Sequence, residues 1–455
     1  MASTMTIVCA LMVVGQLAGY GAGAFIGMTW GRQSAQRLLP SQVVDLLLQN
    51  GVTHLRIFST QEDILRAFAG SNIDLTITIF DPLLPDFNDA RSWFQLKAHF
   101  IVPANVSTVI VGGDYVFDKP LWFIDRAMKT LRDAQAAFNE FGYGARMKAN
   151  FIHNSGELTN RTRPSDVEFR PCIVERMIQH LQFLRENDAP FMLDLFPIDD
   201  ARRCGLDLSF GFADNASNVI VRDRNGAVYK NVVEWEYDCF VWALRKLNFS
   251  DIRILISQVG WPTDGCVGAT AHNAERFYRY LLPLVASNRG TPMRPGVAIS
   301  VYVHALTDEP KMSYNNPWMR HWGIYTSNGQ PKYKIDLSGK GRDIYPSTVR
   351  GIMRMPDRWC VFSGDKSDMG KVEKQVKKAC TIGDCTTLSP GASCSHLTVD
   401  NNISYAFNVF FQSHFQDERS CDFEGLGYVS DDDPSTDHCV FPVEVVKGQQ
   451  LINFI

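Results

Sequence analysis

Short apolar runs alternate with stretches of helical periodicity through the first 340 residues. Eight runs have the length and residue types of buried strands; they span residues 25–30, 54–58, 73–80, 107–112, 146–151, 191–196, 253–259 and 297–304. Helical stretches lie between them, for instance at 60–69, 121–141, 172–185, 232–247 and 271–286. This α/β pattern predicts a (β/α)8 TIM barrel over residues 25–340, with its site at the C-terminal ends of the strands.

The pattern changes after residue 340. Residues 341–357 are predicted to be a linker and residues 443–455 a tail. Six cysteines crowd the segment between them, residues 358–442; they are Cys360, Cys380, Cys385, Cys394, Cys421 and Cys439. This density predicts a small, mainly helical domain with a disulfide scaffold, whose pairing the sequence leaves open. Zinc is the alternative, but the closely spaced Cys or His pairs that bind zinc are missing.

The N-terminal residues 1–24 predict a cleaved signal peptide. They carry no charged side chain and end in the small residues Ala22-Gly23-Ala24. A membrane anchor is the alternative, but the apolar core at 5–14 is too short to span a bilayer. Asn-x-Ser/Thr sequons add support; they lie at Asn105, Asn160, Asn215, Asn248 and Asn402. The last residues, LINFI after Lys447, give no lipid-anchor signal. We therefore expect a secreted protein, extracellular or in a cell wall, without a membrane span.

Charge and motifs exclude several function classes. The net charge is −4 with a pI near 6.2, and no basic stripe gathers the Lys and Arg residues. We expect no nucleic-acid partner. The chain has no phosphate loop, no G-x-S-x-G motif and no zinc-type His pair, so we expect no cofactor and no metal. The oligomeric state stays open.

The most informative stretch is 253–262, RILISQVGWP, an apolar strand that ends in Gln258 and Trp261. It resembles the S-E-[TS]-G-W-P strand of glycoside hydrolase family 17, the plant-type endo-1,3-β-glucanases, whose Glu is the catalytic nucleophile. Gln258 stands at the position of that Glu. The family's V-G-N-E stretch, which holds the acid/base, is matched by VGGD at 111–114, which places Asp114 at the acid/base. Further matches run over nearly the whole mature chain; they include Gly31, 39–40, 290–292, 294–296 and 320–324.

The resemblance also implies a set of substrate-binding residues. Gly113 replaces an Asn expected to contact the sugar 2-hydroxyl, and Asp194 and Phe196 occupy the family's N-x-Y-P-Y strand end. Glu309 and Lys311 match a third stretch with one residue deleted between them, and Met319 replaces a family Glu. Aromatic side chains near strand ends suit pyranose rings, although they are equally typical of a core; they are Trp30, Phe196, Trp261 and Trp322.

The substitutions at positions 114 and 258 bear directly on catalysis. A retaining glycosidase needs one carboxylate to attack the anomeric carbon and a second carboxyl to protonate the leaving oxygen. The neutral amide of Gln258 is a poor nucleophile, and Asp114 is one methylene shorter than Glu. Asp194 is a conceivable replacement, but a nucleophile must be placed within about half an ångström, which disfavours it.

The cysteine-rich segment resembles carbohydrate-binding module family 43, the X8-type β-1,3-glucan-binding domain. The matching stretches are 359–361, 379–380, 383–385, 390–394, 404–408, 420–423, 433–435 and Cys439. Its aromatics at 405, 407, 410 and 411 are expected mostly in the core, with one open to sugar. Together the two resemblances imply a protein that binds β-1,3-glucan, such as callose or a laminarin-like polysaccharide, on a catalytically impaired barrel, a pseudoenzyme. The alternatives are an active glucan endo-1,3-β-D-glucosidase with residual or altered activity, and a structural protein that binds no sugar.

Overall fold

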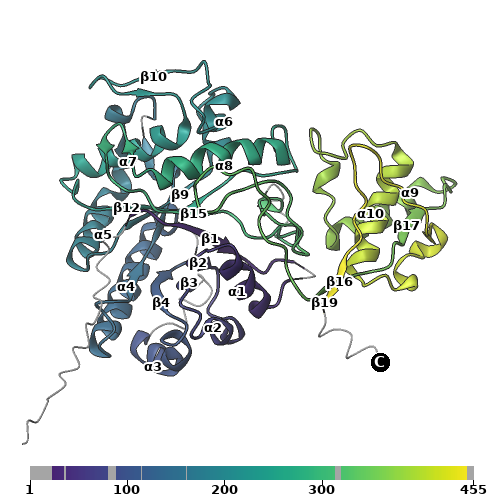
Figure 1. The fold of residues 1–455 in the computed structure, drawn as a ribbon, viewed down its shortest axis with the longest axis horizontal. Helices are drawn as coiled ribbons and strands as arrows, with labels where there is room; N and C mark the ends of the chain where they lie inside the picture. Colours follow the sequence, from purple (N-terminus) through teal and green to yellow (C-terminus); the bar gives the residue numbers. More distant parts are fainter. Residues whose placement is uncertain are drawn as a thin grey trace, which may run out of the picture.

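The computed structural model describes residues 23–34, 37–79, 89–113, 115–159, 161–312 and 319–447. The larger of its two parts is built around a parallel sheet (Figure 1). The strands of this sheet are β1 (Ile26–Trp30), β2 (His54–Ile57), β3 (Asp74–Ile79), β4 (Val106–Val111), β5 (Lys148–Asn150), β6 (Ile152–His153), β9 (Phe191–Leu195), β12 (Ile254–Val259) and β15 (Val301–Val303).

The strand order shows that the sheet curls into a barrel. The order is β5-β4-β3-β2-β1-β15-β12-β9-β6, and every pairing in it is parallel. The two ends of this order, β5 and β6, are separated in the chain by Phe151 alone, so they act as one interrupted strand that joins both edges. The barrel predicted from the sequence is therefore confirmed, with strand ends within a few residues of those expected.

Helices follow the strands and cover the outside of the barrel (Figure 1). They are α1 (Pro40–Gln49), α2 (Glu62–Phe68), α3 (Ala90–Ile101), α4 (Leu121–Glu140), α5 (Val174–Glu186), α6 (Pro197–Arg203), α7 (Val232–Lys246) and α8 (Ala271–Ala286). The longest, α4, shows why they form: Ile124, Ala127, Met128 and Leu131 are buried at helical spacing. Burial of each large apolar side chain in this way contributes roughly 1.5–3 kcal/mol to the stability of the fold.

Three short antiparallel strand pairs lie outside the barrel sheet. They pair β7 (Leu158–Thr159) with β8 (Glu168–Phe169), β10 (Val221–Arg222) with β11 (Val228–Tyr229), and β13 (Gly290–Thr291) with β14 (Arg294–Pro295).

The cysteine-rich segment folds as a separate small domain beside the barrel (Figure 1). Helices α9 (Met369–Ile382) and α10 (Val399–Ser413) pack with an antiparallel pair, β17 (Trp359–Phe362) and β18 (Gly427–Ser430). Three disulfides join its cysteines as Cys360–Cys421, Cys380–Cys385 and Cys394–Cys439. The helical, disulfide-rich C-terminal domain expected from the sequence is confirmed.

The stretch expected as a linker is packed and paired. The backbone oxygens of Arg350 and Gly351 accept hydrogen bonds from Gln42 of α1, and Ser347 donates its N–H to Asn50 Oδ1. Strand β16 (Ile352–Arg354) then pairs with β19 (Val445–Lys447), which lies in the expected tail. The stretch at 347–351 is therefore fixed to the barrel at α1 and Asn50, and the expected tail pairs with the strand that follows it. No helix in the described ranges is long and apolar enough to cross a membrane.

Candidate active site

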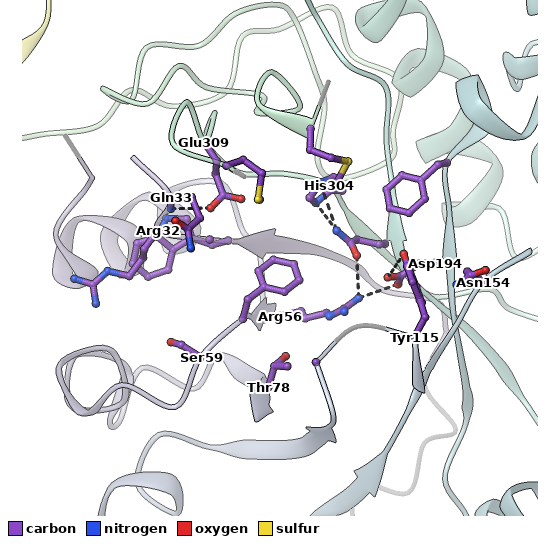
Figure 2. Close-up of a pocket in the computed structure, with 18 of the residues that line it drawn as sticks. Arg32, Gln33, Arg56, Ser59, Thr78, Tyr115, Asn154, Asp194, His304 and Glu309 are labelled. Atoms are coloured by element: carbon purple, nitrogen blue, oxygen red, sulfur yellow. Dashed lines mark hydrogen bonds and ion pairs between the residues drawn. The ribbon is translucent and has the colours of Figure 1, made fainter. Parts of the chain in front are cut away.

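A cavity of about 980 Å³ opens at the C-terminal ends of the barrel strands (Figure 2). Almost every strand delivers a residue to it at or just beyond its end. These include Trp30 from β1, Arg56 from β2, Thr78 from β3, Gly113 after β4, Asn154 after β6, Asp194 from β9, Gln258 from β12 and His304 after β15. The cavity therefore occupies the place at which barrels of this kind carry their active sites.

Gln258 lies in this cavity and is held from both sides. Its side chain is almost fully buried, at 5% exposure. Its Oε1 accepts from Arg56 Nη1 at 3.3 Å, and its Nε2 lies 2.8 Å from His304 Nδ1. A neutral amide can accept from the guanidinium and donate to an imidazole nitrogen that carries no proton. The neighbours of Gln258 thus accommodate an amide.

Asp194 lies on the neighbouring strand and faces the same guanidinium (Figure 2). Its Oδ1 accepts from Arg56 Nη1 at 2.8 Å and from Ser257 Oγ at 2.6 Å, and its Oδ2 accepts from Tyr115 at 3.4 Å. Arg56 and Asp194 are each 3% exposed. A buried ion pair with several hydrogen bonds is rigid, so Asp194 has little freedom to act on a ligand.

His304 is neutral in this environment. Burial, and then the positive charge of Arg56, lower the pKa of His304 to about 3. Thr29 Oγ1 also lies 2.8 Å from Nδ1, so the ring is fixed between β1 and Gln258. His304 therefore holds the Gln258 amide without adding a charge to the cavity.

Glu309 belongs to a second cluster, apart from Asp194 and beside Gln33 (Figure 2). It accepts the backbone N–H of Gln33 at 2.9 Å, and burial raises the pKa of its carboxyl to about 7. Gly31 permits this approach, because a Cβ at that position would collide with the Glu309 carboxylate. Lys311, also on the cavity wall, donates its backbone N–H to the backbone oxygen of Gln33.

The predicted aromatic platforms divide into two pairs. Trp30 and Phe196 line the cavity; Phe196 is partly exposed, whereas Trp30 is only 1% exposed. Trp261 is fully buried outside it, stacked on Phe212 at 4.3 Å, with its Nε1 donating to the oxygen of Gly268. Trp322 is buried behind Phe196 and His304, which it contacts at ring distances of 5.5 Å. These placements correct the expectation that Trp261 and Trp322 present a face to sugar, because other aromatic rings already cover them.

Other predicted residues are also accounted for. Gly113 and Met319 line the cavity, and Asp114 lies outside the described residues. In the small domain, the aromatics Tyr405, Phe407, Phe410 and Phe411 are all buried, so none provides an exposed platform. No group of three or more His, Cys, Asp or Glu that could hold a metal occurs in the part of the chain that the structure describes.

Two domain families match the sequence. Residues 26–337 match Glycosyl hydrolases family 17, which covers more than half of the chain. The chain belongs to this family. In this family 17 chain, residues 358–428 match the X8 domain. The barrel and the small domain thus correspond to the two matches.

Two relatives and one solved structure resemble this chain over most of its length. Glucan endo-1,3-beta-glucosidase 8 of Arabidopsis thaliana is 33% identical over 440 residues, which are 93% of this chain and 90% of the relative. Glucan endo-1,3-beta-glucosidase 5 of the same plant is 32% identical over 433 residues, or 92% and 88%. The structure of CJP38, a β-1,3-glucanase and allergen of Cryptomeria japonica pollen, superposes with a TM-score of 0.64 at 26% identity, covering 69% of this chain and 99% of that one.

Sequence reasoning missed Arg56, His304, Thr29 and Tyr115, which hold Gln258 and Asp194 in place. One signal was present. Arg56 stands inside the apolar strand HLRIF, and a charged residue in a buried strand needs a partner. The identity of that partner depends on the barrel, because Asp194 is 138 positions away along the chain.

Proposed function

We propose that this family 17 protein binds β-1,3-glucan in its barrel cavity and through its X8 domain, and that the cavity hydrolyses glucan weakly or not at all. The main support for this proposal is the residue at position 258, Gln258. It stands where family 17 enzymes have their nucleophile, and Arg56 and His304 bind it as a neutral amide. An amide cannot form the glycosyl-enzyme intermediate of a retaining mechanism.

Two acids of the cavity, Asp194 and Glu309, stand in stretches that resemble the family's site, and neither replaces the nucleophile. Asp194 is committed to Arg56 and Ser257. Glu309 has a raised pKa and accepts from Gln33, so at mildly acidic pH it is largely an uncharged acid. Neither group therefore supplies a carboxylate that can attack a sugar.

The features that would bind sugar are retained. Specific ligand pockets commonly measure about 300–1,000 Å³, so a cavity of about 980 Å³ can hold several pyranose rings. Its wall combines the partly exposed ring of Phe196 with amide, hydroxyl and charged groups, the mixture that sugar hydroxyls and C–H faces require. The three disulfides of the X8 domain support secretion, because such bonds persist in oxidising compartments.

The test is release of reducing ends from laminarin by the purified protein, beside a Gln258→Ala control. We expect both proteins to give the same background rate, since loss of a nucleophile or a general acid typically costs at least about 10²–10⁴-fold. Activity that is present in the wild type and lost in Gln258→Ala would overturn the proposal.

An active glucan endo-1,3-β-glucosidase is the second candidate. The names of the relatives that match over nine tenths of this chain support it. Under this candidate, wild-type hydrolysis would exceed the control and would fall in Asp114→Ala.

A further inference from the structure

Gln258 and Asp194 share one donor on neighbouring strands. They are paired in register between β12 and β9. Both accept from the same nitrogen, Arg56 Nη1, which lies 2.8 Å from Asp194 Oδ1 and 3.3 Å from Gln258 Oε1. A change of charge at either position therefore alters the electrostatic environment of the other, because both contact this guanidinium.

Arg56 needs an anion, and within the described residues its ion-pair partner is Asp194. Its side chain is buried, with the Phe58 ring 5.0 Å from the guanidinium carbon. A buried cation without a counter-charge is strongly destabilising, whereas a second anion on the same cation brings two like charges together. The arrangement of one Arg, one Asp and one Gln is therefore balanced.

We propose that Asp194 carries the negative charge that family 17 enzymes place at position 258, so that Asp194 is a positioning residue that neutralises Arg56 and lets a neutral side chain occupy position 258. By resemblance, Asp194 replaces a family Asn and Gln258 a family Glu, so the two substitutions together leave the number of carboxylates unchanged. The carboxylate thus lies on β9 at Asp194 instead of on β12 at position 258, and it still faces Arg56. This proposal deepens the proposed function, but its test uses no glucan, so each can fail alone.

Other groups around the pair decide what a second carboxylate would do. His304 and Thr29 approach Gln258 from the β1 and β15 side, while Ser257 and Tyr115 bind Asp194. In Gln258→Glu with Asp194 retained, two carboxylates share the buried cation Arg56, which raises the pKa of the new carboxyl. Relative to the wild type, this variant is therefore expected to lose stability as pH rises above about 4.3, the ordinary pKa of Glu.

The experiment is a double-variant cycle on the full chain, read as the apparent midpoint of thermal unfolding at pH 4.5 and pH 7.5. Asp194→Asn leaves Arg56 without an anion and should lower the midpoint by roughly 5 °C or more. Gln258→Glu should be closer to wild type at pH 4.5 than at pH 7.5. The double variant Asp194→Asn/Gln258→Glu restores one anion and should regain at least half of the loss at both pH values.

Asp238→Asn is the matched control. Asp238 is a fully buried acid that accepts from Tyr229 and Thr291 rather than from an Arg, so Gln258→Glu should not rescue its loss. If Asp194→Asn is insoluble, a soluble double variant supports the proposal. If the double variant does not fold although Gln258→Glu does, the proposal is contradicted. Additive losses in the double variant, or an unchanged midpoint in Asp194→Asn, would also overturn it.

Discussion

His321 of the barrel and Asp384 of the X8 domain form an ionic contact across the two domains, with Nε2 3.1 Å from Oδ2. Arg320 adds a second contact to the same carboxylate at 3.0 Å, and Thr386 Oγ1 lies 2.9 Å from His321 Nε2. Arg320 and His321 directly follow Met319, which lines the cavity. The X8 domain is therefore fastened beside the cleft.

This contact predicts a pH-dependent loss of stability on the alkaline side. Burial alone would lower the pKa of His321, but the carboxylates of Asp384 and Asp308 raise it from 6.5 to about 10. Because the folded pKa is raised, the stabilisation is complete below about pH 6.5 and disappears as pH rises through 10.

The variant His321→Gln checks this prediction. Its midpoint of unfolding should lie well below wild type at pH 6 and approach wild type at pH 10.5, while the exposed His396→Gln should change neither value. A His321→Gln deficit that is equal at both pH values would show that the contact is not ionic.

Glu309 predicts a second pH effect. Burial raises the pKa of its carboxyl from 4.5 to about 7, so ionisation costs stability as pH rises through this interval. Glu309→Gln keeps an acceptor for the Gln33 N–H and removes the charge. Its unfolding midpoint should match wild type near pH 4.5 and exceed it above pH 7. The exposed Glu373→Gln serves as control, and a difference that does not vary with pH would contradict the account.

The X8 domain should depend on its cross-links. It has a small core of its own around Phe407, Phe411 and Cys360, and disulfides are typically worth about 2–4 kcal/mol each. A fragment spanning residues 350–447, which keeps β16 with β19, should fold and bind insoluble β-1,3-glucan while oxidised. Reduction should abolish the pull-down. Equal binding by the reduced fragment, or six free thiols in the folded fragment, would contradict the prediction.

The sequence predicted the barrel because each strand is a compact apolar run, as in Val106–Val111, and each helix carries a regular stripe, as in α4. It predicted less of the site. Trp261 follows a strand end, and only the fold shows that Phe212 covers it. Asp194 was identified as a substitution, but its pairing with Arg56 depends on a contact between strands far apart in sequence. A residue whose role is to position another side chain, as Arg56 does, leaves little sign of that role in the sequence around it.

Restored hydrolysis should require removal of the Asp194 charge. Gly113→Asn, Asp114→Glu, Gln258→Glu and Met319→Glu return the family residues, and Gly113 has a φ of 61°, which Asn tolerates. With Asp194 retained, the carboxylate introduced at position 258 shares Arg56 with a second acid, so rescue should be weak.

Adding Asp194→Asn to these four changes should increase laminarin hydrolysis by roughly tenfold or more, which corresponds to about 1.4 kcal/mol of transition-state stabilisation. The control is the same variant without the Gln258→Glu change, which should show none of the gain. Equal rates with and without Asp194→Asn would show that this charge does not limit the restored site.

We expect the protein to bind glucan without cleaving it. The most direct measurement is calorimetric titration of the full chain with a β-1,3-linked glucose hexamer, followed by mass spectrometry of the recovered sugar after prolonged incubation. We predict saturable binding, weakened when Phe196 is replaced by Ala, and recovery of the intact hexamer. Shorter oligosaccharides in amounts that vanish in Gln258→Ala, or no binding at all, would contradict the account.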